Sequence, residues 1–554
     1  MGKLIPNAFN LAVVIFVALG STACSYGMAI IGSTIGQPSF YRSLHLAPQG
    51  EPGYGRTAEY IGAFNGTLLD LIRPHSEWLL TFLQPGVNSA GSAIGAAACA
   101  YCADKWSRKH TIQVAAIILV IGAAICAGSV NNAMFLVGRV INGLGIGALV
   151  TAIPMYQAEV STPESRGFMV SMHGVMFAMG YTLSAFIGFG VSFISSGGSP
   201  SSFPWRFPIA FQMVPALLLL IGSPWLPYSP RWLLMHDRHD EAHEVIKRLH
   251  RTKNDTHDSL ARKEFYQMKK QVELDRQISA TTSRWEIFKT PANRRRALVG
   301  FVLMWNNQFT GVLIIANYGV ILYLQLGMTD FWPLLLSAFW VLSTFPGNIF
   351  CAFFVERFGR RRFLLIGLTG ILVCLICEIA IQATYLGTDN RVALNFGVFF
   401  IFLFITPFWS TFIDASQFLY VSEIFPTHIR SQGMAVSMCG MYLADIILLV
   451  AGPIALNNIG WKFFLVLIIP TALHIVFVFF MCPETKGRSL EDINAQFGEQ
   501  VAIHYYNATD AEKEELEKAA QQDEEEEAQK TRTSLGEKTA EDVEEREIIA
   551  ANKA

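Results

Sequence analysis

Apolar stretches of about 20 residues recur along the chain as far as about residue 482. This length matches the hydrocarbon core of a bilayer, which is roughly 30 Å thick. Only 16% of the 554 residues are charged, against about a quarter in soluble domains, and no soluble core encloses twelve helices that are apolar on every side. We therefore predict an all-α membrane protein with twelve transmembrane helices. They are expected at about residues 10–33, 84–103, 111–130, 134–153, 169–194, 207–226, 298–325, 333–355, 363–384, 393–420, 432–455 and 462–482.

A pattern of acids and bases occurs twice, with about 250 residues between the copies. In each copy, one acid precedes a base by four residues, and a second acid further on precedes a base by seven. The residues are Asp104, Arg108, Glu159 and Arg166 in the first copy, and Glu356, Arg360, Glu423 and Arg430 in the second. Such duplication is typical of transporters whose substrate path runs between two similar halves. We expect two six-helix bundles.

The charge distribution predicts the domains and their orientation. The two bundles are expected at residues 1–226 and 298–482, a cytoplasmic loop with amphipathic helices at 227–297, and a mostly disordered cytoplasmic tail at 483–554. Lys and Arg concentrate in the loops after the second, fourth, eighth and tenth spans, and short loops of this kind stay in the cytoplasm. Both termini are then cytoplasmic. We expect a monomeric, multi-pass protein of the plasma membrane, in contact with the lipid bilayer.

Residues 67–87 interrupt the second span. A single helix from Ala58 to Ala103 would be about 70 Å long at 1.5 Å per residue, which is too long for a bilayer. Joining the flanking segments directly gives one span of ordinary length. The segment is therefore predicted to be an insertion, either an unremoved intron in the gene or a genuine extracellular loop. Sequencing the transcript would decide between the two.

Enzyme and cofactor chemistry finds no support in the sequence. The nine cysteines all lie inside predicted spans, so they form no disulfide framework. The Cys99-x-x-Cys102 and Cys374-x-x-Cys377 spacings are better explained by small residues on one helix face. We find no nucleophile–base set, metal cluster or phosphate-binding loop. The sequence predicts no catalysis, no cofactor, no metal and no nucleic-acid partner.

Six short signatures lie in order at the predicted helix boundaries. They are Asp104 to Lys109, Pro154 to Gly167, Pro227 to Leu233, Glu356 to Arg361, Tyr420 to Arg430, and Pro483 to Gly487. Together they resemble the sugar porter family of the major facilitator superfamily, and Gly36 to Phe40 looks most like fungal sugar and hexose transporters. The resemblance implies transport of a sugar or related polyol by alternating access, by proton symport or by facilitated diffusion. A nontransporting nutrient sensor on the same fold is the alternative.

The resemblance also implies a substrate site in the membrane core. Sugar porters hold hydroxyls with amides and aromatics, above all on the seventh helix, and Gln308, Thr310 and Gly311 match that pattern. Several amides are replaced, and Gly174 stands where a fifth-helix Gln is expected, so a glucose substrate does not follow. The predicted substrate-binding residues are His173, Asn307, Gln308, Asn317, Tyr318, Thr344, Asp414, Phe418 and Tyr442.

Asp414 is the candidate for proton coupling. Proton-coupled relatives carry an Asp in the first helix, where this chain has Gly27, whereas Asp414 lies in the tenth span at a position where relatives have Gly. A carboxylate at bilayer depth is costly and is usually functional. Asp414 is predicted either to carry a proton or only to hydrogen-bond the substrate. Asp445 is a further carboxylate in the eleventh span, and Glu378 in the ninth is expected to be peripheral.

The duplicated acids and bases predict a gating network. Partly desolvated pairs at helix ends gain more than exposed ones. If they form only when the cytoplasmic side is shut, they favour the outward-facing state. Simple anchoring by positive loops is the alternative, and it explains the Arg and Lys residues but not Glu159 and Glu423.

Overall fold

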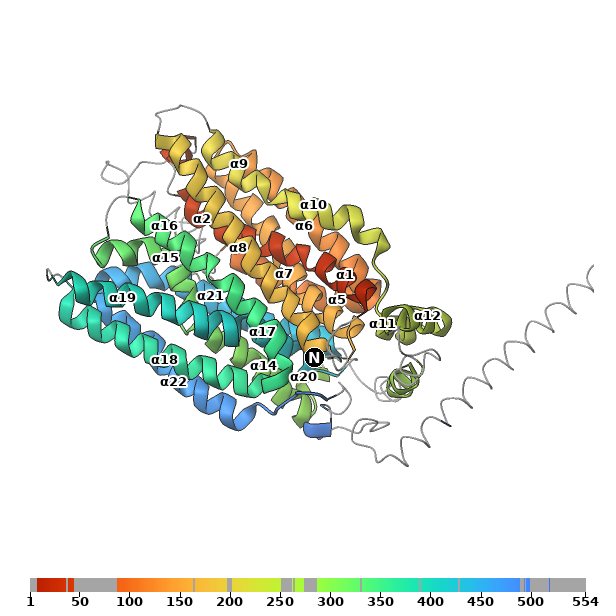
Figure 1. Ribbon diagram of the computed structural model, residues 1–554. Coiled ribbons are helices and arrows are strands. Elements are labelled where there is room, and N and C mark those ends of the chain that lie inside the picture. Colours follow the sequence, from red (N-terminus) through yellow and green to blue (C-terminus); the bar gives the residue numbers. More distant parts are fainter. Residues whose placement is uncertain are drawn as a thin grey trace, which may run out of the picture.

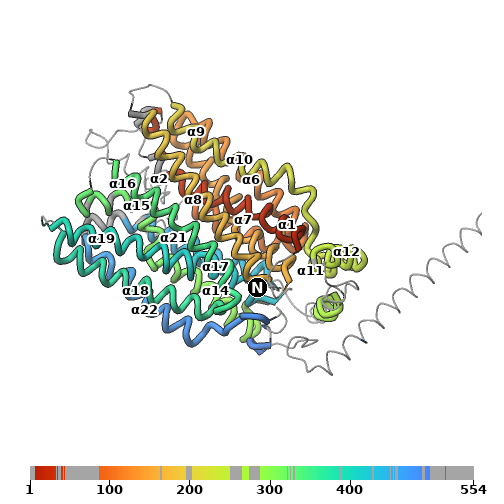
Figure 2. Tube along the Cα trace, viewed as in Figure 1, coloured from red at the N-terminus to blue at the C-terminus, as the bar shows by residue number. Residues whose placement is uncertain are grey.

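The computed structural model describes residues 7–35, 38–43, 87–162, 165–196, 202–250, 262, 265–273, 286–328, 331–386, 388, 390–426, 429–488, 493, 495–498 and 518. Every regular element within these ranges is a helix (Figures 1 and 2), so the all-α prediction is confirmed. Residues 67–86 of the predicted insertion and nearly all of the tail beyond residue 498 lie outside the described residues.

The helices form two groups that pack side by side, the first half in red to yellow and the second in green to blue (Figure 1). The first half contains α1 (Ala8–Val17), α2 (Leu19–Ile35), α3 (Pro38–Ser43), α5 (Val87–Trp106), α6 (Arg108–Ala127), α7 (Asn132–Val160), α8 (Arg166–Ser196), α9 (Phe203–Phe211), α10 (Met213–Gly222) and η2 (Ser223–Trp225). Along the chain, α11 (Pro230–Met235) and α12 (His239–His250) connect the two halves. The second half contains η3 (Glu286–Phe288), α14 (Pro291–Gln308), α15 (Val312–Gln325), α16 (Trp332–Leu342), α17 (Thr344–Phe358), α18 (Arg360–Tyr385), α19 (Arg391–Leu403), η4 (Phe404–Asp414), α20 (Ala415–Ile424), α21 (Arg430–Ile459), η6 (Gly460–Lys462) and α22 (Phe463–Met481).

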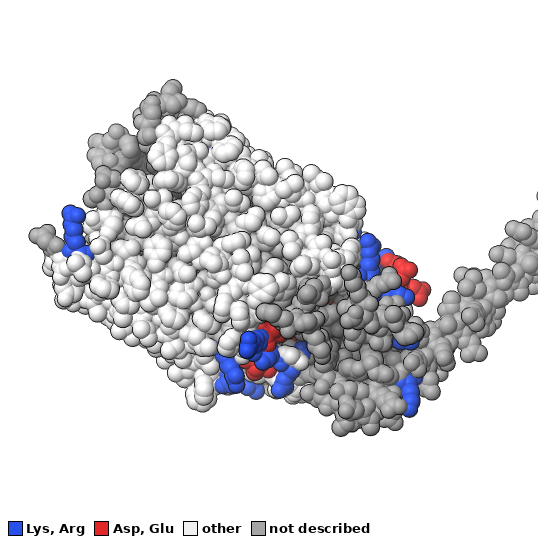
Figure 3. All heavy atoms as spheres, in the orientation of Figure 1, with Lys and Arg blue, Asp and Glu red and all other residues white. Residues whose placement is uncertain are grey.

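Eleven helical stretches in the described ranges are long and apolar enough to cross a membrane. The remaining expected span is α5, whose Gly, Ala and Ser residues and terminal Asp104 and Lys105 make it less apolar. α5 packs against α7 and α21, so neighbouring helices cover much of it and small side chains suit it. On the face seen in Figure 3, the bundle surface is largely free of charge, and most charged residues gather at the end near α11 and α12. We call this end the charged end.

The seventh predicted span is broken between α14 and α15. Gly311, the N-cap of α15, has φ +96°, a left-handed conformation that costs glycine least. The break interrupts the helix between Gln308 and Val312, and both residues line the cavity described below. Discontinuous helices are a common way to bring polar groups to a transport site.

The tenth span contains a π-helix, η4, which includes Pro407. Proline has no N–H, so it cannot make the usual bond to the carbonyl four residues earlier. The hydroxyls of Ser410 and Thr411 both donate to the carbonyl of Thr406, at 2.7 and 3.1 Å. Since a π-helix bonds residue i to i+5, it turns the following side chains relative to an ordinary α-helix. η4 ends at Asp414, and its register therefore sets where that carboxylate points.

Candidate functional site

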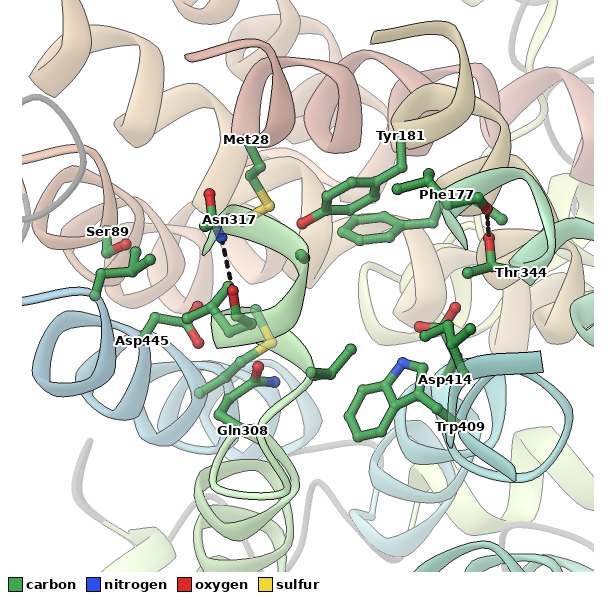
Figure 4. Close-up of a pocket in the computed structure, with 18 of the residues that line it drawn as sticks. Met28, Ser89, Phe177, Tyr181, Gln308, Asn317, Thr344, Trp409, Asp414 and Asp445 are labelled. Atoms are coloured by element: carbon green, nitrogen blue, oxygen red, sulfur yellow. Dashed lines mark hydrogen bonds between the residues drawn. The ribbon is translucent and has the colours of Figure 1, made fainter. Parts of the chain in front are cut away.

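A cavity of about 120 Å³ lies between the two halves (Figure 4). On the same measure, a single water needs only roughly 10–15 Å³, so a small polar molecule is a realistic occupant. The walls come from α2, α5, α7 and α8 of the first half and from α14 to α17, η4, α20 and α21 of the second. Because both halves line the cavity, a motion of one half against the other changes the shape of the cavity and the access to it.

Amide and hydroxyl groups of the second half form one polar wall. Gln308 at the end of α14 lines the cavity; its backbone carbonyl accepts from the Gly311 N–H at 3.2 Å, while its side-chain amide makes no hydrogen bond to the described residues. Asn317 Nδ2 donates to the Leu313 carbonyl at 3.0 Å, which leaves its side-chain oxygen as the free acceptor. Thr344 Oγ1 donates to the Val341 carbonyl at 2.7 Å (Figure 4).

Two carboxylates line the same cavity on opposite sides (Figure 4). Asp414 Oδ2 accepts a hydrogen bond from Asn348 Nδ2 at 2.8 Å, and Trp409 lies beside it in the close-up. Asp445 is 6% exposed, and within the described part of the chain its carboxylate accepts no hydrogen bond. A carboxylate buried at bilayer depth is costly, which makes both residues candidates for a function.

Aromatic rings form much of the remaining wall. Phe177 and Tyr181 on α8 have ring centroids 5.5 Å apart, and both are seen pointing into the cavity in Figure 4. Phe418 on α20 lies 6.1 Å from Phe177, so the rings of the two halves meet. Trp340 and Trp409 complete the aromatic lining. Such rings suit the apolar face of a ligand that carries polar groups on its edge.

α8 approaches the second half closely at Gly174, about one turn before the lining residue Phe177. A Cβ atom on Gly174 would lie 2.5 Å from the Ala415 Cβ and 2.6 Å from Asn348 Oδ1. Only glycine allows this contact, because any side chain would displace one of these groups. Asn348 is also the residue that bonds Asp414, so the close contact and the carboxylate are coupled through one amide.

Arg139 is a buried cation of the first half that also lines the cavity. Its Nη1 donates to the backbone carbonyl of Gly27 at 3.1 Å. Gly27 occupies the position where the resemblance implies an Asp in proton-coupled relatives. The guanidinium therefore bonds a neutral carbonyl at that position instead of a carboxylate.

At the charged end, the first half holds a buried ion-pair cluster. Arg108 contacts Asp104 at 3.3 Å and Glu159 at 3.0 Å, and the side chains of Arg108 and Glu159 are fully buried. Ser229 Oγ donates to Glu159 Oε2 at 2.5 Å. Arg166 is buried at the first residue of α8. Buried pairs of this kind are expensive to break because one charge is then left uncompensated.

The second half repeats this cluster. Arg360 contacts Glu356 at 2.7 Å and Glu423 at 2.9 Å. Thr485 Oγ1 donates to Glu423 at 2.7 Å, as Ser229 does to Glu159. The duplicated sequence pattern thus corresponds to a duplicated three-dimensional arrangement.

Hydrogen bonds and one ion pair join the two halves at the charged end. Arg430 Nη1 lies 3.3 Å from Glu159 Oε1, and the Gly167 N–H donates to Glu356 at 2.5 Å. The Ser431 hydroxyl donates to Asp104. These contacts cross from α7, α8 and α5 to α21 and α17, so the two halves are held together at this end.

Comparison with known proteins identifies the family. A sequence model described as "Sugar (and other) transporter" matches residues 13–497. The chain belongs to this family. The MFS-type transporter criB of Aspergillus cristatus is 31% identical over 419 residues, which cover 76% of this chain and 84% of that protein. The sugar transporter STL1 of Saccharomyces cerevisiae is 30% identical over 411 residues, covering 72% and 68%.

Solved structures agree with the fold of the transporter. The proton:xylose symporter XylE, of the major facilitator superfamily, superposes with a TM-score of 0.73 at 22% identity, covering 89% of this chain and all of XylE. The predicted major facilitator fold and the predicted family are both confirmed. The prediction of a membrane transporter is confirmed with them.

The structure brings five of the nine predicted substrate residues of the transporter to the cavity wall. They are Gln308, Asn317, Thr344, Asp414 and Phe418. The other four lie behind the wall. Tyr318 donates through its hydroxyl to the Leu449 carbonyl at 3.0 Å, and the buried Tyr442 hydroxyl has no partner among the described residues.

His173 and Asn307 are also behind the wall, each against a lining residue. His173 Nδ1 is 2.7 Å from the Ser21 hydroxyl, and its ring centroid is 4.7 Å from that of Phe418. Asn307 Nδ2 donates to Gln417 Oε1 at 3.0 Å. Both residues contact the site indirectly.

Sequence reasoning missed Tyr181, Trp409, Gln417 and Arg139 as lining residues of the transporter. Tyr181 could have been found, because it lies two turns after His173 on the same face of one helix. Trp409 carried no such signal, since its direction depends on the π-helix. Gln417 immediately precedes Phe418, and only the packing of α14 against α20 shows that Gln417 bonds Asn307.

Proposed function

We propose that the transporter carries a sugar or related polyol by alternating access, with the cavity between the halves as its binding site. The cavity's composition carries this proposal: amides and a hydroxyl face aromatic rings contributed by both halves. Amides suit hydroxyl groups, and rings suit the apolar face of a sugar. The printed names of STL1 and XylE, a sugar transporter and a xylose symporter, support this substrate class. No catalytic step or cofactor is required.

Uptake of radiolabelled sugars and polyols tests this function. The full-length protein is expressed in cells that lack their own sugar transporters, and uptake is measured at several pH values. We expect saturable uptake of at least one hexose, pentose or polyol. Surface expression without uptake or exchange of any of them would instead support the nutrient-sensor alternative.

We further propose that the charged end faces the cytoplasm, together with both termini, in the plasma membrane. Support comes from the Lys and Arg residues of that end, since positive loops remain in the cytoplasm. The protein is expected to act as a monomer, because each chain supplies both halves of the cavity.

The ion pairs at the charged end are proposed to stabilise the state that is shut on that side. Arg430 and Glu159 belong to different halves, so this pair has to separate when the cavity opens toward the charged end. Arg430→Ala should then raise the reactivity of cysteines introduced into the cytoplasmic vestibule. Unchanged reactivity would contradict the gating role.

Asp414 is proposed to carry the coupling proton. It lines the cavity, and among the described residues its carboxylate accepts one hydrogen bond, from the neutral Asn348. Asp414→Asn should abolish accumulation against a gradient while preserving exchange at equal concentrations, because a neutral side chain still permits the halves to move. Glu378→Gln is the matched control: Glu378 is also a buried intramembrane carboxylate, but it bonds Gln382 on its own helix. Wild-type uptake that is insensitive to pH and to a protonophore would leave facilitated diffusion as the mechanism.

A further inference from the structure

A chain of buried hydrogen bonds leads from α22 in the second half to the cavity. His474 on α22 has its Nε2 atom 3.0 Å from Asn307 Oδ1 on α14. Asn307 Nδ2 lies 3.0 Å from Gln417 Oε1 on α20. His474 and Asn307 are both 0% exposed, whereas Gln417 lines the cavity. No residue of α22 lines it, so His474 reaches the site only through the two amides.

The histidine determines the direction of this chain. The other ring nitrogen, Nδ1, is buried and has no hydrogen-bond partner within the described residues. A buried N–H without an acceptor is rarer, and hence costlier, than a buried acceptor without a donor. The proton of neutral His474 therefore belongs on Nε2, where Asn307 Oδ1 accepts it. A protonated ring would also donate from Nε2, so the direction is the same in either form.

Each amide then transmits this direction to the next group. With its oxygen occupied by His474, Asn307 can only donate to Gln417, through Nδ2. Gln417 accepts through Oε1, and its NH₂ group is what remains for the cavity. In the opposite arrangement, His474 would accept from Asn307, leave its own Nδ1–H without a partner, and turn the Gln417 oxygen toward the cavity.

We propose that His474 is a positioning residue for substrate recognition: through Asn307, it makes Gln417 a hydrogen-bond donor to an oxygen of the substrate. The group recognised is a hydroxyl that acts as an acceptor, as the hydroxyls of a sugar or polyol can. This inference rests on the proposed function. It also accounts for Asn307, which the sequence predicts as a substrate ligand but which instead supports the lining residue Gln417.

The first test needs no substrate. In purified full-length protein with ¹⁵N-labelled histidine, the ring-nitrogen shifts report which nitrogen carries the proton. The signals of His474 are assigned by their loss in His474→Gln. A neutral Nε2–H form or a doubly protonated ring supports the proposed direction. A neutral Nδ1–H form would overturn it, whatever the protein transports.

The second test uses substrate analogues to determine whether the Gln417 amide donates to the substrate or accepts from it. Binding of D-glucose and of its deoxy and deoxyfluoro analogues is followed through tryptophan fluorescence, because Trp340 and Trp409 line the cavity. At the position that meets Gln417, the fluoro analogue should bind better than the deoxy analogue, since fluorine can still accept. The difference should vanish in Gln417→Met and in His474→Leu. Equal binding of the two analogues at every position of wild-type protein would contradict the inference. If D-glucose itself does not bind, glucose is excluded as a substrate, and the tautomer measurement alone decides the direction of the chain.

Variants of His474 separate positioning from simple stability. His474→Leu removes the donor and should raise the apparent KM for D-glucose roughly five- to thirty-fold with little change in maximal rate. His474→Gln retains a donor and should restore most of the affinity. Thr471→Val is the matched control, because Thr471 is a fully buried residue one turn earlier that bonds only its own helix, at Leu467. If His474→Gln and His474→Leu lose the same amount of affinity, His474 acts only through packing.

Discussion

The cavity and the charged end are both polar regions buried between the two halves, but their carboxylates differ in partners. At the charged end, Glu159 is bonded by Arg108, Arg430 and Ser229. In the cavity, Asp445 accepts no hydrogen bond from any described residue. The charge of Glu159 is therefore paired within the protein, whereas the carboxylate of Asp445 is available to whatever occupies the cavity.

This difference separates charges that hold a conformation from charges that meet a ligand. A paired buried charge resists removal of its partner, because the remaining charge would be uncompensated. An unpaired one is costly to keep, and its retention is best explained by an occupant that arrives and leaves. Four substitutions, from the largest expected effect to the smallest, test this distinction.

Glu159→Ala should be the most damaging change. It leaves Arg108 and Arg430 buried without their carboxylate, a loss of about 3–5 kcal/mol, and we expect a large fall in melting temperature and loss of transport. Glu241→Ala is the control, because the side chains of Arg238 and Glu241 are 39% and 53% exposed, and a surface pair of this kind is worth about 0–1 kcal/mol. Equal melting temperatures of the two variants would show that the buried cluster contributes no more stability than a surface pair.

Gly174→Ala should have the next largest effect. The added methyl group would clash with Ala415 and Asn348, and overpacking of this kind costs about 1–3 kcal/mol. We expect a lower melting temperature and greater access to the cavity from the charged end, measured by cysteine labelling. Gly190→Ala on the same helix has no atom within 4 Å of the new Cβ and should behave as wild type. If Gly174→Ala keeps the wild-type melting temperature and labelling, α8 is free to move away from the second half.

Gln308→Ala tests the polar wall of the cavity. Loss of one substrate hydrogen bond, worth roughly 1–2 kcal/mol, should raise the apparent KM by roughly five- to thirty-fold, with normal surface expression. Gln382→Ala removes a buried amide from α18, where it bonds Glu378 away from the cavity, and should leave KM unchanged. Wild-type affinity in Gln308→Ala would remove helix α14 from the site.

Asp445→Asn should have the smallest effect on stability. No bond to a described residue is broken, and removal of an unpaired buried charge should leave the melting temperature unchanged or slightly higher. Substrate affinity should change nonetheless, because the residue lines the cavity. A melting temperature as low as that of Glu159→Ala would mean that Asp445 is structurally paired after all.

Most of the fold could be predicted from local features of the sequence. The duplicated pattern of Asp104, Arg108 and Glu159 marked the charged ends of helices, and the structure places these residues together. The site was less predictable. Trp409 faces the cavity because η4 is a π-helix, and apolar periodicity carries no information about that register.

Span length and the repeat of charged residues follow from the chain itself, because the bilayer selects for about 20 apolar residues wherever a helix crosses it. Tertiary structure alone decided which buried polar groups have partners. Asn307 looked like a substrate ligand but bonds His474 and Gln417, which lie more than one hundred residues away in the sequence. Hydrogen bonds depend on distances of about 3 Å between atoms of different helices, and only the packing of α14, α20 and α22 sets those distances.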